Sequence, residues 1–248
     1  MSTPAPTGAT PANKKNPLRP ANIAKALGIA LLLLYALFPF YWMLTTAVDT
    51  HANSRGAGIL PSGFTLDHFK TVLIDANFFE YIKVSLIVAA GTVLLSGAIA
   101  LFAAIGVARY RFRLRTVVLV LVLMVQMVPL EALVIPLFLQ ARTLNMLNSL
   151  LGLVIVYLAF SLPFAIWNLK GFVAAVPKEL EEAAYIDGAG WFRMFFSILL
   201  PLVAPGLVAT SVFAFITAWN EFIFALTFMT DSSKYTVGVG PVSYTHLR

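Results

Sequence analysis

Two carboxylates lie inside apolar stretches of the sequence, where few acidic residues occur. Glu131 and Glu221 are flanked mainly by leucine, valine, alanine and phenylalanine. An ionised carboxylate surrounded by lipid is strongly unfavourable unless it faces protein or water. We therefore expect both side chains to point inward, away from lipid.

Several other kinds of chemistry are excluded by residue types and spacing. The sequence has no cysteine, so it forms no disulfide, thiolate nucleophile or cysteine-ligated metal site. His51, His68 and His246 lie outside the long apolar runs and lack metal-ligand spacing, so we interpret them as surface residues. There is no GxSxG or paired-aspartate motif, which argues against an intramembrane hydrolase. There is also no GxxxxGK[ST] phosphate loop, so the chain cannot hydrolyse ATP alone.

A segment from 169 to 198 separates two apolar runs and carries a pattern typical of a short helix. Pro177 suits a first helical turn, and the acidic residues that follow complement exposed backbone amides there. Asp187 to Gly190 then permit a tight turn before an aromatic-rich helix. A short helix held at both ends is suited to docking into a partner's groove. The alternative is an amphipathic helix that merely closes a loop at the membrane surface.

The spacing in this segment also resembles a known signature. Glu182-Ala183-Ala184 is followed after three residues by Gly188, after nine more by Ile198, and after one more by Leu200-Pro201. This resembles the complete EAA signature of permeases from binding-protein-dependent ATP-binding cassette (ABC) importers. In that family the short helix inserts into a cleft of the ATP-binding subunit, and the glycine lets the chain turn. The resemblance implies an ATPase-coupling role for Glu182, Ala183, Ala184, Asp187, Gly188, Ile198, Leu200 and Pro201.

The resemblance implies the fold and the partners as well. We expect an all-α membrane protein, a polytopic transmembrane helix bundle of the type I ABC importer kind. The implied partners are a second permease subunit in a heterodimer, two ATP-binding cassette ATPase subunits and an extracytoplasmic solute-binding protein. This chain would bind no cofactor, since ATP and Mg²⁺ belong to the ATPase subunits. It would be a transporter subunit of the bacterial inner membrane and not an enzyme.

Other segments resemble the carbohydrate branch of the family, and in particular the smaller maltose-system permease. These segments are Phe38 to Met43, Phe64 to Phe69, Gln126 to Ala132 and Trp219 to Phe222. Sugar or oligosaccharide uptake is therefore favoured over uptake of another solute by the same family. An ion-coupled secondary carrier, with Glu131 and Glu221 relaying ions, is the alternative from another class; it is weakened by the absence of an inverted repeat.

Polar residues near the two intramembrane carboxylates are candidates for the substrate path. One interpretation gives them hydrogen bonds and a stacking face for a sugar. The other places Glu131 and Glu221 near helix ends, where each pairs with a backbone amide or a subunit partner. The candidates are Gln126, Glu131, Trp219, Asn220 and Glu221.

Long apolar helices must position these residues, because 60% of the chain is hydrophobic, 11% is charged and its mean hydropathy is +0.87. A helix needs about 20 residues to cross the hydrocarbon core, and backbone satisfaction in lipid makes each span helical. The basic residues, with a net charge of +6, punctuate the apolar runs and do not form a nucleic-acid site. The predicted spans are 27–48, 82–108, 116–140, 149–168 and 199–229.

The lysines and arginines of the short loops predict the orientation. They are concentrated in the amino-terminal tail, in a cluster from Arg109 to Arg115, and in the segment 169–198. These three regions alternate as cytoplasmic, which places the amino terminus inside. Residues 1–22 are polar and proline-rich and predict a flexible cytoplasmic tail. Relatives have a sixth span, so we expect it to be lost by truncation here, and we interpret 241–248 as a non-native tail.

Overall fold

The computed structural model describes residues 20–51, 60–75 and 78–246. The chain divides into two units, the first ending at Thr71 and the second beginning at Val72. Within the described residues all regular elements are helices, apart from one isolated β-bridge between Asp49 and Phe64. Residues 1–19 of the predicted flexible tail, 1–22, lie outside the described residues. The all-α expectation is confirmed.

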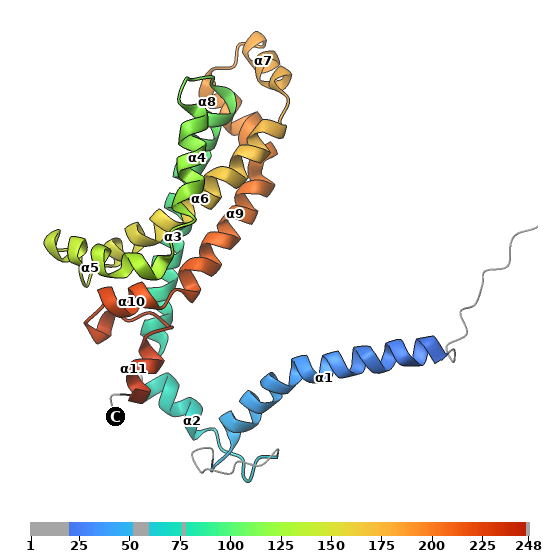
Figure 1. Ribbon diagram of the computed structural model, residues 1–248, viewed down its shortest axis with the longest axis vertical. Coiled ribbons are helices and arrows are strands. Elements are labelled where there is room, and N and C mark those ends of the chain that lie inside the picture. Colours follow the sequence, from blue (N-terminus) through green and yellow to red (C-terminus); the bar gives the residue numbers. More distant parts are fainter. Residues whose placement is uncertain (1–19, 52–59, 76–77, 247–248) are drawn as a thin grey trace, which may run out of the picture. The chain divides into compact units, whose positions relative to one another are not determined.

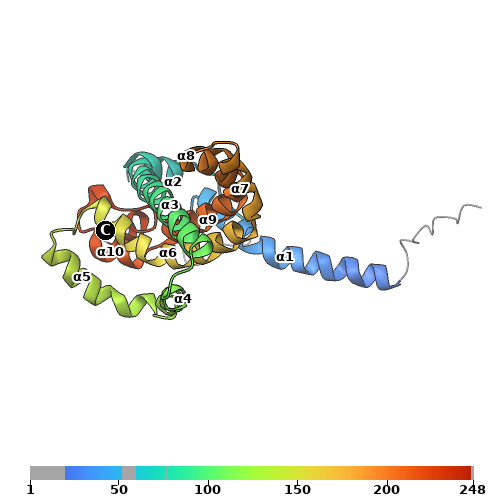
Figure 2. The same ribbon diagram turned by 90° about the horizontal axis from the view of Figure 1, so that it is seen from above.

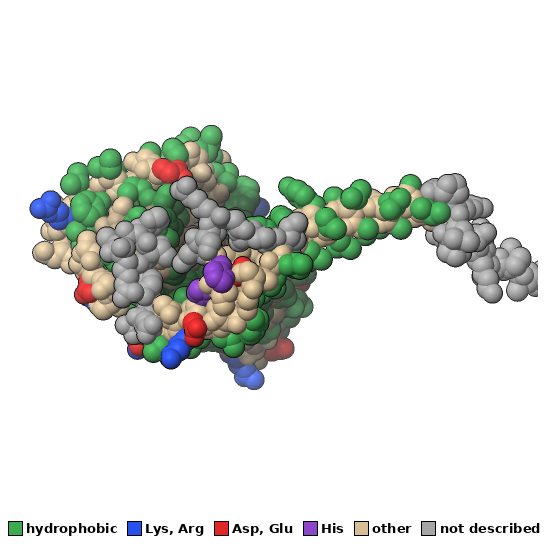
Figure 3. All heavy atoms as spheres, turned by 90° about the horizontal axis from the view of Figure 1, so that it is seen from below, with side chains coloured by type: hydrophobic (Ala, Val, Ile, Leu, Met, Phe, Trp, Pro, Cys, Tyr) green, Lys and Arg blue, Asp and Glu red, His purple; other side chains and the backbone are tan. Residues whose placement is uncertain are grey.

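The first unit is built on the long helix α1 (Pro20–Val48), followed by α2 (Asp67–Lys70). The π-helical turn η1 (Thr71–Asp75) begins at the last residue of the first unit and continues into the second. The most apolar part of α1 has none of its side chains buried within the chain. Hydrophobic side chains cover its visible length (Figure 3). Because lipid is the natural solvent for such a surface, α1 has the properties of a membrane span.

A small hydrogen-bond network closes the loop that follows α1. The Asp49 carboxylate accepts hydrogen bonds from the Ser62 hydroxyl at 2.6 Å and from the His51 backbone N–H at 3.0 Å. His68 Nε2 lies 3.0 Å from the Asp49 carbonyl oxygen. The Ser62 hydroxyl, and then the His51 amide, hold the pKa of Asp49 below its ordinary value. The ionised carboxylate therefore organises this turn.

Three long helices form the body of the second unit: α3 (Phe78–Arg109), α6 (Leu150–Ala175) and α9 (Leu200–Asn220). They pack side by side in both ribbon views (Figures 1 and 2). Small residues allow the close approach. Ala100 and Ala104 on α3 are fully buried, and a side chain at Gly206 of α9 would overlap the Phe172 ring of α6.

Shorter elements complete the second unit, and they gather at the two ends of the long helices (Figure 1). One end carries α7 (Lys178–Ile186), α8 (Trp191–Met194) and the π-helical turn η3 (Phe195–Leu199). The other end carries α10 (Ile223–Phe228), η4 (Ser232–Lys234) and α11 (Gly240–His246). Each end has its own apolar core, one around Phe224 and Phe228 and the other around Phe195 and Leu199.

The predicted span 116–140 is not one continuous helix. It consists of α4 (Arg115–Val125), then the 3-10 turn η2 (Leu130–Leu133) and α5 (Val134–Thr143), and the two halves meet at 92°. Pro129 lies at the break in an extended conformation and lacks an N–H donor. A hydropathy window does not detect this break, because the residues around it remain apolar.

The bounds of the last two predicted spans also differ from those of the helices. In place of 149–168, α6 continues to Ala175 and ends before Pro177, which favours an extended Val176. In place of 199–229, the helix runs from Trp191 through η3 and α9 to Asn220. It stops there because Glu221 is extended, and the separate helix α10 follows.

The described residues contain four helices that are long and apolar enough to cross a membrane, or five if the bent pair counts as one span. The predicted coupling segment 169–198 includes the end of α6, all of α7 and α8, and most of η3. The prediction that 241–248 is non-native stays a prediction; its first six residues belong to α11, and residues 247–248 lie outside the described part.

Candidate functional site

The helix α7 begins where the sequence predicts a helix start. Pro177 precedes its first residue with φ −59° and ψ 134°, and Glu179 and Glu181 lie in its first turn. Acidic side chains at this end are favourable because the first amide groups of a helix have no partner within it. The chain therefore leaves α6 at Val176, turns sharply and starts a new helix within two residues.

The end of α7 is fixed by a Schellman motif. The Ala189 N–H donates to the Ala184 carbonyl at 2.9 Å, and the Gly188 N–H donates to the Tyr185 carbonyl at 3.1 Å. Gly188 has φ +82°, the left-handed conformation that this motif requires and that other L-residues rarely adopt. These bonds satisfy carbonyl groups that the helix end would otherwise leave free. The direction of the chain after α7 is thus set by one glycine.

The residues matched to the signature divide into exposed and packed groups. Glu182, Ala183, Asp187 and Gly188 are exposed on α7 and its turn. Ala184 is buried against the apolar core at this end of the bundle, so its small side chain lets α7 lie close to the body. Ala183 and Ala184 are neighbours in sequence, yet only Ala183 is available to a partner.

The remaining signature residues lie in the helix that leads back into the bundle. Ile198 and Leu200 are half-buried and pack against the same apolar core as Ala184. Pro201 is the second residue of α9, directly after the π-helical turn η3. Trp191 stacks on the buried Phe195 with ring centroids 5.1 Å apart. These contacts join the turn after α7 to the start of α9.

Two exposed apolar residues at this end were not predicted as site residues. Ile186, the last residue of α7, is 87% exposed, and Phe192 is 73% exposed. Exposed aliphatic and aromatic side chains beside a rigid turn are typical anchors for a protein partner. Their exposure depends on how the helix is rotated against the body, and no local sequence pattern reports that rotation.

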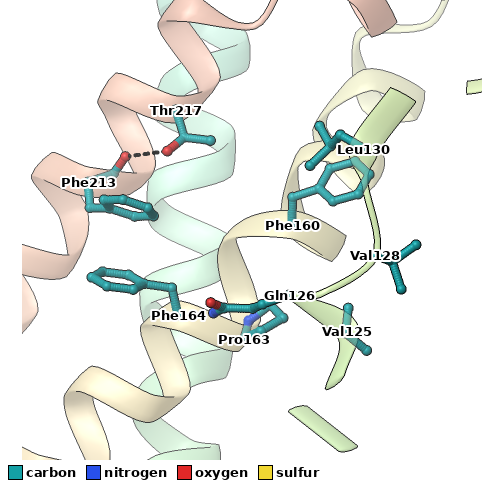
Figure 4. A pocket seen from close by; sticks show the side chains of 9 residues that line it. All are labelled: Val125, Gln126, Val128, Leu130, Phe160, Pro163, Phe164, Phe213 and Thr217. Carbon is teal, nitrogen blue, oxygen red and sulfur yellow. Dashed lines mark hydrogen bonds between the residues drawn. The ribbon is translucent and has the colours of Figure 1, made fainter. Parts of the chain in front are cut away.

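A hollow of about 200 Å³ lies at the bend between α4 and η2 (Figure 4). The Phe164 ring of α6 and the Phe213 ring of α9 pack against each other on one side of it, with centroids 3.9 Å apart. Gln126 supplies an amide group beside Pro163, and the Thr217 hydroxyl donates to the Phe213 carbonyl. The hollow therefore combines aromatic faces with hydrogen-bonding groups.

Glu221 does not line this hollow, and its carboxylate already has three donors. It accepts the Tyr157 hydroxyl at 2.6 Å and the backbone amides of Phe224 and Ala225 at 2.8 and 3.0 Å. The carboxylate caps the start of α10 and links it to α6. This geometry corresponds to the helix-end interpretation of Glu221.

The other substrate-path candidates are also separate from the hollow. Glu131 is exposed in η2, next to Leu130, which does line the hollow. Trp219 stacks on Phe215 with centroids 5.5 Å apart, and Asn220 is exposed at the end of α9. Of the five candidates, Gln126 lines the hollow. Phe164 and Phe213 were missed, because phenylalanine within an apolar run has no pattern that separates packing from binding.

The opposite end of the bundle is held together by Asn148, which has φ +55°. Its side-chain oxygen accepts hydrogen bonds from the backbone amides of Thr230 and Asp231 at 2.7 and 3.0 Å. The Lys234 ammonium group donates to the backbone carbonyl of Asn148 at 2.7 Å. Hydrogen bonds from the Ser233 N–H and hydroxyl hold the pKa of Asp231 below its ordinary value. The turn before α6 is thus fixed to the loop after α10.

Residues 96–240 match the family of binding-protein-dependent transport system inner membrane components. The chain belongs to this family. Its permease relatives include the diacetylchitobiose uptake system permease protein DasC of Streptomyces coelicolor, 40% identical, with 86% of this chain and 78% of the relative covered. The trehalose/maltose transport system permease protein MalG of Thermococcus litoralis is 37% identical over the same shares of the two chains.

The fold of this permease also matches a solved structure, a bacterial ABC transporter involved in the import of the acidic polysaccharide alginate. The TM-score is 0.78 at 22% identity, covering 95% of this chain and 83% of the other. The expected permease fold is therefore confirmed. This binding-protein-dependent permease is a multi-pass inner-membrane protein and a transporter subunit.

Proposed function

We propose that this permease carries a sugar or oligosaccharide, and that α7 receives movement from a separate ATPase subunit. The relatives that support a carbohydrate solute are named for the uptake of diacetylchitobiose and of trehalose and maltose. The proposed partners are a second permease subunit, two ATPase subunits that bind ATP and Mg²⁺, and an extracytoplasmic solute-binding protein. No cofactor is assigned to this chain.

The geometry of α7 is the observation that carries the ATPase-docking role. Glu182, Ala183 and Ile186 are exposed on a helix whose end is fixed by the Gly188 turn. Its other side is packed through Ala184 onto the body of the bundle. A rigid protrusion with one exposed face binds a partner without a large entropic cost of ordering. When the ATPase subunits close on ATP, α7 would move with them and tilt the helices attached to it.

Charge supports a cytoplasmic position for α7. Arg111 and Arg113 are exposed after α3, Lys178 is the first residue of α7, and Arg193 lies within α8. The end of α3, α7 and α8 all lie at the same end of the second unit (Figure 1). Short cytoplasmic loops of membrane proteins are enriched in lysine and arginine. The amino terminus would then be cytoplasmic as well, as the order of spans predicts.

Gln126 is the residue that we propose for the substrate path, together with Phe164 and Phe213. A sugar presents both hydroxyl groups and apolar C–H faces, and the hollow offers an amide beside aromatic rings. Glu221 is assigned to the support of α10, because its two oxygens already accept three hydrogen bonds. This use of Glu221 leaves an ion-relay role without support.

Thiol labelling tests the position and the docking of α7 directly. The chain has no cysteine, so Ala183→Cys introduces a single thiol. A membrane-impermeant maleimide should label it in inside-out vesicles alone, and the ATPase subunits should protect it. Ser232→Cys, at the other end of the bundle, is the matched control and should label in vesicles of the opposite orientation. Equal labelling of Ala183→Cys with and without ATPase subunits would contradict the docking role.

Uptake measurements test the solute. The permease, reconstituted with its ATPase, second permease and solute-binding protein, should accumulate labelled diacetylchitobiose, trehalose or maltose only when ATP is supplied inside. Labelled amino acids and peptides are the comparison. Accumulation by this chain alone without ATP would contradict the ABC mechanism, and ATP-driven uptake confined to a non-sugar solute would contradict the sugar assignment.

A further inference from the structure

One arginine at the end of α3 joins three structural elements. Arg109 is the last residue of α3, and its Nε and Nη2 both lie 2.7 Å from Glu181 Oε1 in the first turn of α7. Its Nη2 also donates to the Val176 carbonyl at 2.9 Å, directly after α6. A single guanidinium therefore links the ends of α3 and α6 to the start of α7.

The environment of this contact differs from that of an ordinary surface ion pair. The Arg109 side chain is 9% exposed and that of Glu181 is 14% exposed. By contrast, Arg111 and Arg113, which belong to the same basic cluster, are exposed. Hydrogen bonds between charged groups that are shielded from water are stronger and less screened by salt than surface pairs. The guanidinium also satisfies a carbonyl that the end of α6 leaves free.

Few other polar contacts attach the first turn of α7 to the other helices. Across residues 20–51, 60–75 and 78–246, no other side-chain hydrogen bond or ion pair reaches α7 from another helix. Ala184 is the buried residue of the helix, and it lies one helical turn after Glu181. Besides its covalent connection to α6 through Val176 and Pro177, α7 is therefore held by Arg109 near its start and by Ala184 with the Gly188 turn near its end.

The two attachments lead to different helices. The end of α7 continues through α8 and η3 into α9, whereas its start is tied through Arg109 to α3. We propose that Arg109 is a positioning residue that holds α7 to α3 during the ATPase cycle, so that displacement of α7 moves α3 together with α9. This inference rests on the proposed docking of the ATPase at α7. Without the contact, α7 would stay connected to α6 and α9 through the chain, but its displacement would no longer be passed directly to α3.

Distances between spin labels test this directly. Labels at Lys178→Cys on α7 and Ile99→Cys on the exposed side of α3 report their separation in a complex that is otherwise free of cysteine. With Arg109 intact, the separation should be the same in the nucleotide-free and the ADP–vanadate-trapped complex. In Arg109→Gln and Glu181→Gln, the separation should change between the two states. Equal behaviour of the native chain and both variants would overturn the proposal.

Activity measurements separate positioning from simple destabilisation. Arg109→Gln and Glu181→Gln should keep ATP hydrolysis but lower the solute transported per ATP by about tenfold, within the usual range of coupling between sites. Arg109→Lys and the exchanged pair Arg109→Glu with Glu181→Arg should recover part of this ratio. Arg111→Gln, an exposed member of the cluster, is the matched control and should behave like the native chain. An unchanged ratio in both glutamine variants would overturn the proposal.

A further arm distinguishes this inference from the docking role on which it rests. Ile186→Asp changes the exposed face of α7 and leaves the Arg109 contact in place. Loss of ATPase co-purification in this variant supports docking at α7. The spin-label distances and the solute-per-ATP ratios of the Arg109 variants then test the role of Arg109 separately. Unchanged co-purification and uptake in Ile186→Asp would contradict docking at this face and would remove the basis of the tie as well.

Discussion

Replacement of Gly188 gives the sharpest prediction, because at this position the effect of backbone strain can be measured without any steric clash of the new side chain. A Cβ atom at Gly188 would meet nothing within 4 Å, but the residue has φ +82°. The left-handed conformation costs an L-residue about 1–2 kcal/mol. Gly188→Ala should therefore strain the turn by about that amount with no clash. Gly188→Val should cost more, since β-branching restricts the backbone further, and Gly188→Asn should cost less.

Gly190 provides a matched control two residues away. A Cβ atom there also meets nothing within 4 Å, but φ is −72°, a conformation that any residue adopts. Gly190→Ala should consequently leave the turn unstrained. The two glycines differ in backbone conformation and not in available space.

The assay is ATP-driven uptake by the reconstituted complex, together with co-purification of the ATPase subunit. A strain of 1–2 kcal/mol can lower the population of the native turn by a factor of about 5 to 30. ATPase binding should weaken by up to that factor in Gly188→Ala, less in Gly188→Asn and more in Gly188→Val. Membrane insertion should be unchanged. Normal uptake by Gly188→Val, or equal damage from Gly190→Ala, would refute the reasoning.

Three further predictions concern the body of the permease and its first loop. Gly206→Ala should lower the free energy of unfolding of the purified protein by about 1–3 kcal/mol, because the added methyl group would overlap the Phe172 ring. Gly171→Ala is the control and should have no such effect, since a Cβ atom there meets nothing within 4 Å. Equal melting temperatures of the two variants would contradict the packing argument. Glu221→Gln should destabilise the start of α10 by about 1–3 kcal/mol, because one buried donor loses its acceptor. Tyr157→Phe removes one of the three hydrogen bonds to the carboxylate and should destabilise α10 less. Hydrogen exchange of the Phe224 and Ala225 amides would measure both effects. The pKa of Asp49 is lowered in the folded loop, so its stabilisation is present above the ordinary value of 3.8 and is lost as the pH falls through the lowered pKa. Ser62→Ala removes the largest cause and should move that loss to higher pH, measured as protease sensitivity of the loop against pH; an unchanged profile would contradict it.

Local sequence patterns predicted much of the coupling segment. Pro177 and the acidic residues after it indicated the start of α7, and Gly188 indicated its end; the structure has a helix from Lys178 to Ile186 between them. These signals are readable because helix ends are governed by backbone groups within a few residues. Hydropathy likewise predicted the long helices, since lipid selects apolar side chains over whole spans.

Contacts between distant residues could not be predicted in the same way. Arg109 and Glu181 are 72 positions apart, and Tyr157 and Glu221 are 64 positions apart. Which charges meet depends on how three helices pack, and the sequence alone does not specify their rotation or depth. For the same reason, Glu221 was a candidate for the substrate path, although its carboxylate caps α10. Pro129 favours a kink, but hydropathy does not report a bend as large as 92°, because the residues around it are as apolar as the span itself.

The π-helical turn η3 lies where the coupling segment joins the rest of the permease. It occupies Phe195–Leu199 within one helix that runs from Trp191 to Asn220. A π-turn accommodates an extra residue, and one residue of an α-helix corresponds to a rotation of about 100°. The extra residue is absorbed within the wide turn, so deleting it would restore a regular α-helix and leave α8 and α9 in nearly the same angular relation. A one-residue deletion in the regular part of α9 has no such turn to absorb it, and it would rotate α8 and everything before it by about 100° relative to the rest of α9. The helix should therefore tolerate a deletion in η3 better than a deletion in α9.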